Sequence, residues 1–146
     1  MTIPNWLAGT YVGSGWWYEA TGRSQNYRIR HTNRGTDTGF EILFKHDFED
    51  GSVVEANFTM TWTSLNLFSV STGGKLMGNG YLMDEFCHYH LEVGGAFVAV
   101  NLMPVANRLR VFGSSTKNKE GHYIAWSEVL ERAKNGDYFK TPNNAL

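Results

Sequence analysis

The stretch 39-GFEILFKHDFEDGSVVEANFTMTW-62 decides the fold class of this chain. In its first half, mainly apolar residues alternate with mainly polar ones, and the mainly apolar set is Phe40, Ile42, Phe44, His46 and Phe48. Successive side chains of a β-strand point to opposite faces, so this set should face a core. Asp50-Gly51 then marks a hairpin turn. The returning strand carries a second alternating set, namely Val54, Ala56, Phe58, Met60 and Trp62.

Similar patterns continue on both sides of this hairpin. Turn signals recur roughly every 8 to 14 residues, which is typical of all-β sandwiches and barrels. Further strands are expected at 10–20, 25–32, 65–71, 76–83, 86–93, 96–103, 108–114 and 122–126. Gly9, Gly13 and Gly15 predict a bend in the first strand, which a barrel needs in order to close. The chain is therefore predicted to be all-β, a single antiparallel up-and-down barrel of 8–10 strands.

The end of the sequence predicts a short helix. Ser127 can cap it, Glu128 and Glu131 suit its first turn, and Asn135-Gly136 can stop it. The alternative is a strand that continues through Val129, and we favour the helix. One domain is expected over 1–146, with its core in 6–134 and a tail at 135–146.

Composition narrows the choice of partners. Thirteen Lys and Arg against fourteen Asp and Glu leave a net charge of −1, which argues against nucleic acid. A single cysteine, Cys87, cannot form an internal disulfide. The first residues lack the pattern of a signal peptide, and no apolar run approaches the roughly 20 residues of a membrane span. We therefore expect a cytoplasmic location without membrane contact. A homodimer through an exposed edge strand stays open.

Aromatic residues make up 14% of the chain, which is common where strands face a core or a ligand. Bulky side chains together with interior polar groups predict a cavity that holds a small aromatic or hydrophobic molecule. The expected lining residues are Trp16, Tyr18, Tyr27, Phe44, Phe58, Met60, Trp62 and Trp126. The alternative is a structural or interaction barrel whose interior is filled by these side chains.

Histidines are the main candidates for chemistry. His46 shares the predicted inner face and could move a proton near neutral pH, or it could be a core histidine with a hydrogen-bond partner. In 86-FCHYHLE-92, spacing of two puts His88, His90 and Glu92 on one face. That face could be functional or simply solvated. No second histidine motif accompanies it, so no metal and no cofactor are expected.

Short motifs resemble known barrel families. Trp6-Leu7-Ala8-Gly9-Thr10-Tyr11 resembles the short helical entry and first strand of the calycins, the superfamily of lipocalins and fatty-acid-binding proteins. Gly15-Trp16-Trp17 is similar to the Gly-x-Trp signature of lipocalins. The resemblance implies a lipocalin-like barrel that opens with a short turn of helix.

Other stretches resemble bacterial phenolic acid decarboxylases, which are also lipocalin-like. Asn26-Tyr27-Arg28-Ile29 is similar to the strand that supplies their active-site arginine. Similar segments are Val98–Pro104, Asn107-Arg108-Leu109 and Asn135–Phe139. The paired catalytic tyrosines of that family have no clear counterpart. Its glutamate position falls on Met83, with Asp84 and Glu85 beside it.

This resemblance implies that Arg28 anchors a substrate carboxylate, although alternation alone puts Arg28 in solvent, opposite Tyr27. The predicted function is binding of the small molecule, extended to a cofactor-independent lyase, decarboxylase or isomerase step on an aromatic or unsaturated carboxylic acid. His46, His88 or His90 would move a proton, with Glu85 or Glu92 assisting. The alternative is a carrier or sensor that binds a hydrophobic ligand such as haem, with a histidine on the iron.

Overall fold

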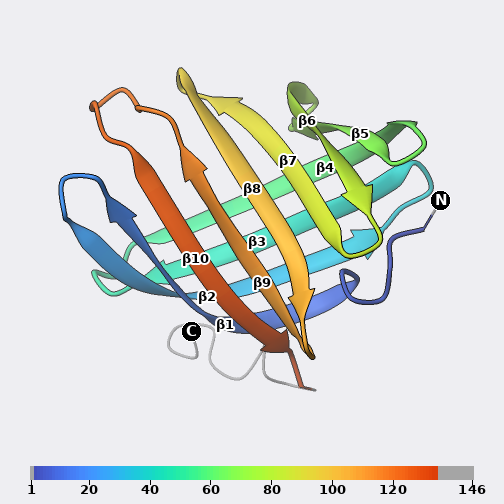
Figure 1. Cartoon of the computed structure of the whole chain (residues 1–146), viewed down its shortest axis with the longest axis horizontal. Coiled ribbons are helices and arrows are strands. Elements are labelled where there is room, and N and C mark those ends of the chain that lie inside the picture. Colours follow the sequence, from blue (N-terminus) through green and yellow to red (C-terminus); the bar gives the residue numbers. More distant parts are fainter. Residues whose placement is uncertain (1, 135–146) are drawn as a thin grey trace.

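The computed structural model describes residues 2–134, which form ten antiparallel strands around one interior (Figure 1). The strands are β1 (Gly9–Glu19), β2 (Ser24–Gly35), β3 (Gly39–Phe48), β4 (Val53–Ser64), β5 (Leu67–Thr72), β6 (Lys75–Met83), β7 (Phe86–Val93), β8 (Ala96–Val105), β9 (Arg108–Ser115) and β10 (Ile124–Arg132). Each strand pairs with the next along the chain, and β1 pairs with β10, so the sheet is a closed barrel. The prediction of an up-and-down barrel is confirmed.

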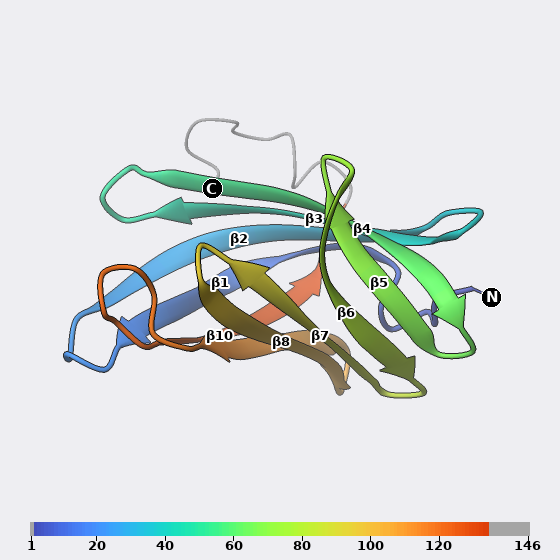
Figure 2. The same cartoon turned by 90° about the horizontal axis from the view of Figure 1, so that it is seen from above.

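The barrel is flattened into two crossing walls. In Figure 1 β7–β10 form the near wall and β1–β4 the far wall, while Figure 2 shows the same walls from above. Bulges interrupt the pairing between β4 and β5 and between β5 and β6, where the sheet bends from one wall to the other. Among the described strands none lies at an open sheet edge. The edge-strand route to a homodimer, which the sequence left open, is therefore not offered by the described strands.

The predicted C-terminal helix is wrong. Residues 124–132 form β10, which pairs with β1 on one side and β9 on the other. Ser127 and Glu128 resemble a helix start, but nine residues of ladder on the β1 side satisfy this backbone instead. The predicted stop at Asn135-Gly136 lies outside the described residues. At the other end, the predicted short turn of helix is not formed either: residues 5–7 form a hydrogen-bonded turn, in which Leu7 and Ala8 donate to the carbonyl of Pro4.

The N-terminal segment seals one end of the barrel. Leu7 is fully buried, and its carbonyl accepts a hydrogen bond from the Asn33 amide. The Tyr11 hydroxyl donates to the carbonyl of Trp6, whose indole donates to the carbonyl of Asp84. Behind this plug the interior is packed with large apolar side chains. They include Phe40, Ile42, Met60, Phe68, Leu102, Leu109 and Leu130.

Alternation predicted the inner face of β3 correctly. Phe40 and Ile42 are fully buried, and Phe44 packs against the same core. In β1 the predicted face was wrong, because the inner positions are odd-numbered: Tyr11 is buried, while Trp16 and Tyr18 are 45% and 43% exposed on the outside. Residues 2–134 contain no helix that is long and apolar enough to cross a membrane.

Candidate functional site

The barrel interior is packed only in the half behind the N-terminal plug. The other half holds a cavity of about 340 Å³. Apolar and aromatic side chains dominate its lining, with a few polar groups among them. The lining residues are Trp17, Tyr27, His31, Phe44, His46, Val54, Phe58, Tyr89, Leu91, Val93, Val98, Val100, Val111, Ile124, Trp126 and Glu128.

The cavity extends towards the end of the barrel opposite the plug. Val54, Val93 and Ile124 line it, and each lies next to the turn or loop that joins its strand to a neighbour. Those connections are the β3–β4, β7–β8 and β9–β10 segments, which lie at the upper and left ends of the strands in Figure 1. The cavity therefore has its rim at this end of the barrel.

An ion-paired cluster holds this rim together. Glu19, whose side chain is 3% exposed, lies at the end of β1, and its Oε1 is 2.9 Å from Nε of Arg23. Its Oε2 is 2.5 Å from Nδ1 of His122, which belongs to the β9–β10 loop. The carboxylate thus connects that loop to the β1–β2 turn.

Tyr27 and Glu128 form the polar centre of the cavity. Gly15 of β1 pairs with Tyr27 of β2 on one side and with Glu128 of β10 on the other. Because Gly15 has no side chain, its two neighbours meet above it, and the Tyr27 hydroxyl donates a 2.5 Å hydrogen bond to Glu128 Oε2. A Cβ on Gly15 would lie 2.6 Å from Glu128 Cγ and 3.1 Å from Tyr27 Cζ. The glycine is therefore required by this close approach.

His46 completes the polar centre. Its Nε2 is 3.5 Å from Glu128 Oε2, close enough for a weak polar contact. The imidazole stacks on Tyr27 at 4.5 Å between ring centroids and on Phe44 at 4.6 Å. One oxygen of Glu128 thus faces two polar partners, while Oε1 is buried and has no hydrogen-bond partner among the described residues.

Burial keeps this centre uncharged at neutral pH. It raises the pKa of Glu128 to about 8, although the hydrogen bond from Tyr27 acts in the opposite direction. Burial likewise lowers the pKa of His46 to about 3, with His31 nearby adding to the effect. Burial, with Glu128 beside it, raises the pKa of Tyr27 above its ordinary value. At pH 7 the three groups are therefore a carboxylic acid, a neutral imidazole and a phenol.

His31 lies deeper on the same strand as Tyr27 and is fully enclosed. It is 2% exposed, stacks on Phe44 at 6.1 Å, and burial lowers its pKa to about 4. Neither of its ring nitrogens has a hydrogen bond of ordinary geometry, although the side chain of Asn33 acts on the ring and opposes the lowering of its pKa. An incompletely satisfied buried imidazole is unfavourable, and so His31 is a second polar group that a molecule in the cavity could satisfy.

Two tryptophans lie side by side on neighbouring strands of the cavity wall. Trp17 of β1 and Trp126 of β10 are paired in register, and both line the cavity. Trp126 lies against Gly113 of β9, where a Cβ would be 2.5 Å from its Cζ2. The missing side chain at Gly113 gives the indole ring its place in the wall.

The cavity brings together five of the side chains predicted from the sequence. These are Tyr27, Phe44, His46, Phe58 and Trp126. Met60 and Trp62 point inward but do not line the cavity. Met60 is fully buried, and Trp62 packs against Phe40 and Phe68 in the filled half.

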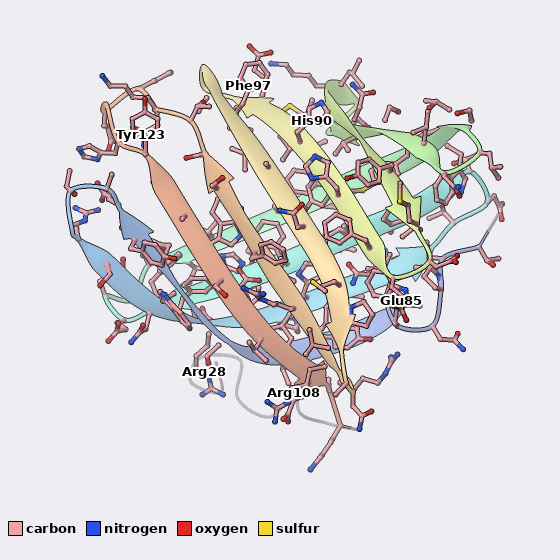
Figure 3. All side chains as sticks on the ribbon, viewed as in Figure 1. Arg28, Glu85, His90, Phe97, Arg108 and Tyr123 are labelled. Carbon is pink, nitrogen blue, oxygen red and sulfur yellow. The ribbon has the colours of Figure 1, made fainter. Side chains whose placement is uncertain are left out.

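The remaining predicted residues lie away from the cavity. They are Trp16, Tyr18, Arg28, Glu85, His88, His90 and Glu92, none of which lines it. Arg28 and Glu85 are both exposed, and Figure 3 shows Arg28 at the lower boundary of the molecule. In β7 the inner positions belong to Cys87, Tyr89 and Leu91, so the two histidines and Glu92 face outward. His88 Nδ1 lies 2.9 Å from Asn101 Oδ1 on that outer face.

Sequence reasoning missed Glu128, His31, Trp17 and Tyr89. Alternation along Ile124, Trp126, Glu128 and Leu130 could have placed the glutamate inside, since it is the inner set of β10. Within residues 2–134 no three His, Cys, Asp or Glu side chains gather in a way that could hold a metal ion.

Comparison with solved structures shows what this fold is similar to. The S-type phycobiliprotein lyase CPES from Guillardia theta superposes with a TM-score of 0.70 at 8% identity, over 88% of this chain and 89% of that one. The structure of EF1p2_mFAP2b bound to DFHBI superposes with a TM-score of 0.52 at 10% identity, over 88% and 94%. At such identities the likeness concerns the fold alone, and it supports the closed antiparallel barrel.

No family model matches the sequence, and no curated protein matches it significantly. The resemblance to phenolic acid decarboxylases therefore gains no support from these comparisons.

Proposed function

We propose that this protein binds a small aromatic or hydrophobic molecule inside the barrel, against the wall formed by Tyr27, His46 and Glu128. One observation carries the proposal: half of the interior is packed, while the other half holds a cavity of about 340 Å³. Ligand pockets span roughly 300–1,000 Å³ and combine apolar lining with a few converging polar groups. The cavity has both properties, and its volume suits a small molecule.

A similar barrel supports this proposal. EF1p2_mFAP2b, which has the same overall fold, was solved with DFHBI bound. A barrel of this architecture can therefore accommodate a small molecule. The filled structural barrel, considered as an alternative, is disfavoured because side chains leave the cavity open.

Proton transfer to the bound molecule is a second candidate function, of the cofactor-independent lyase or isomerase kind. The observation that favours it is the buried Glu128 carboxyl, whose pKa of about 8 keeps it protonated at pH 7, beside the neutral imidazole of His46. A protonated acid whose pKa lies near neutral pH suits general acid catalysis, whereas the lowered pKa of His46 makes it a weak base. Arg28 lies outside the cavity, so a carboxylic acid substrate would lack the anchor expected for it.

A haem carrier would use His46 as the iron ligand, and it can be tested separately. We expect no Soret shift when haem is added, because the Nε2 of His46 faces Glu128 rather than open space. A sharp Soret band that is lost in His46→Ala would favour haem instead.

Ligand binding is best tested with a panel of small aromatic molecules. Trp17 and Trp126 line the cavity, so binding should quench or shift tryptophan fluorescence and should raise the melting temperature. A panel that changes neither signal at millimolar concentration would contradict the proposal.

A further inference from the structure

We infer that the cavity selects a ligand with a protonated nitrogen, such as an amine or amidine on an aromatic body, and binds it as a cation against Glu128. This inference rests on the proposed function and adds the charge of the ligand to it. Its basis is the arrangement of donors, acceptors and rings around one carboxyl group.

Only one of the two carboxyl oxygens of Glu128 has a hydrogen-bond partner among the described residues. Its Oε2 accepts the hydrogen bond from Tyr27 and lies near His46, while its Oε1 has no partner. A buried carboxylate oxygen without a donor is unfavourable, and no N–H or O–H of the described residues is hydrogen-bonded to Oε1. An N–H group of the ligand would supply the missing donor.

The described lining offers no cation to balance an anionic ligand. No Arg or Lys lines the cavity in the part of the chain that the structure describes. On β2, where Tyr27 faces inward, Arg28 faces outward. An anionic ligand would therefore lie beside a carboxyl group without any cation to balance it, which is strongly unfavourable in a low-dielectric interior.

Aromatic rings supply the rest of the environment. Trp17, Trp126, Phe44 and Phe58 all line the cavity together with Tyr27. The face of an aromatic ring carries partial negative charge and attracts a cation, most strongly for tryptophan. Rings and a carboxyl group together are suited to an organic cation, while the same rings bury its apolar body.

Binding of a cation must be coupled to the loss of a proton. The titratable groups that face Glu128 are Tyr27 and His31 from β2, His46 from β3 and Tyr89 from β7. Burial holds all four uncharged at pH 7, since it lowers both imidazole pKa values and raises those of the tyrosines. Glu128 itself is protonated at pH 7, because its pKa is raised to about 8. It would release its proton to solvent when the ligand cation enters.

The test uses three probes that share one ring system: 1-naphthylmethylamine, 1-naphthalenemethanol and 1-naphthoic acid. Titration calorimetry at pH 8 should show the amine binding at least tenfold more tightly than the alcohol, with the acid weakest. Amine affinity in the unmodified protein should fall about tenfold per unit as the pH is lowered from 7 to 6, because one proton is exchanged per ligand. Alcohol affinity should change little over that range.

Glu128→Gln provides the matched variant. It should reduce amine affinity to the level of the alcohol and remove the pH dependence. Glu131→Gln, three residues along the same strand and outward-facing, should behave like the unmodified protein. The pH profile of the unmodified protein gives the same answer without any variant, should Glu128→Gln fold poorly.

Two outcomes separate this inference from the proposed function. Equal binding of amine and alcohol without pH dependence, or tightest binding of the acid, would overturn the inference and leave ligand binding intact. Binding of none of the three, while another uncharged or anionic panel molecule binds, would also overturn it. Absence of binding by any molecule would contradict the proposed function itself.

Discussion

The hydroxyl of Tyr27 donates a 2.5 Å hydrogen bond to Oε2 of Glu128, across the strand that separates them. Tyr27 belongs to β2 and Glu128 to β10, and both pair with Gly15 of β1. The bond joins two buried polar groups that would each be unfavourable alone. It is therefore both a structural bond of the barrel and the centre of the candidate site.

Tyr27→Phe should destabilise the protein by about 1–3 kcal/mol, because Glu128 loses its donor while staying buried. The bond from Tyr27 acts to lower the pKa of Glu128, so the variant should also raise that pKa further. Urea unfolding and a carbon-13 NMR titration of the glutamate carboxyl would measure the two effects. Tyr18→Phe removes a hydroxyl from an outward-facing tyrosine and serves as control. Equal stability of the two variants would contradict the importance of the bond.

Gly15→Ala should destabilise the barrel by roughly 1–3 kcal/mol and weaken ligand binding. The new Cβ would lie 2.8 Å from the carbonyl oxygen of Ser127 and 2.6 Å from Glu128 Cγ, so the polar centre must shift. Gly35→Ala adds the same methyl group where nothing lies within 4 Å. The melting temperature and the probe affinity of both variants test this prediction. If Gly15→Ala changed neither of them, the close approach at Gly15 would not be required.

Strands β3 and β1 show how much of the barrel's inner face can be predicted from the sequence alone. In β3 the alternation has no glycine after Gly39, so the inner face could be read directly, including His46. In β1 the inner positions 13 and 15 are glycines, which removes the apolar signal from that face. The sequence therefore predicts the large even-numbered residues Trp16 and Tyr18 inside, although they face solvent.

Glu128 was hidden for a different physical reason. A glutamate on the inner face contradicts the expectation that carboxylates stay in water, and with Ser127 before it the segment resembles a helix start. Only the closure of β10 onto β1 turns it inward. Functional groups often depart from the local pattern of polar and apolar residues, and for this reason Glu128 was not predicted from the sequence.

His31→Leu should make the protein less sensitive to acid. The pKa of His31 is lowered from 6.5 to about 4, so between these values the unfolded chain takes up a proton that the folded chain rejects. The contribution of His31 to the free energy of unfolding is thus fully present above pH 6.5 and is lost as the pH falls towards 4. Relative to the unmodified protein, the free energy of unfolding of the variant should rise by about 3 kcal/mol between pH 7 and pH 4. Denaturant unfolding across that range measures it.

His90→Leu makes the same change on the outer face and controls for the loss of a histidine in general. Parallel pH profiles of His31→Leu and the unmodified protein would show that His31 is not the acid-sensitive group. Glu128 acts in the other direction: its raised pKa lets the folded state keep a proton between pH 4.5 and about 8, so stability falls as the pH rises through that range.

Val98→Phe should weaken binding of any cavity ligand tenfold or more, equivalent to about 1.4 kcal/mol. Val98 lines the cavity, and a larger ring there occupies space that the ligand needs. Val129→Phe introduces the same ring on the outer face of β10 and should leave affinity unchanged. Fluorescence titration of both variants would locate the ligand, and equal affinities would place it elsewhere.

Arg28→Gln and the double variant His88→Gln/His90→Gln should bind cavity ligands as the unmodified protein does. All three side chains lie outside the cavity, so neither a carboxylate anchor nor a proton carrier is removed from it. The same titrations check this. A loss of more than threefold in affinity would show that the outer face of β2 or β7 contributes to binding.

Closure of the barrel by its first and last strands has a consequence for how the protein is made. Tyr27 and Glu128 are separated by 101 positions in the sequence, and β10 follows the other nine described strands along the chain. Until β10 is in place, the interior has Tyr27 and His46 but lacks Glu128, and the barrel is open between β1 and β9. Occupancy of the cavity would therefore report that β10 has closed the barrel, and a ligand present in the cell would favour the closed form over the open one.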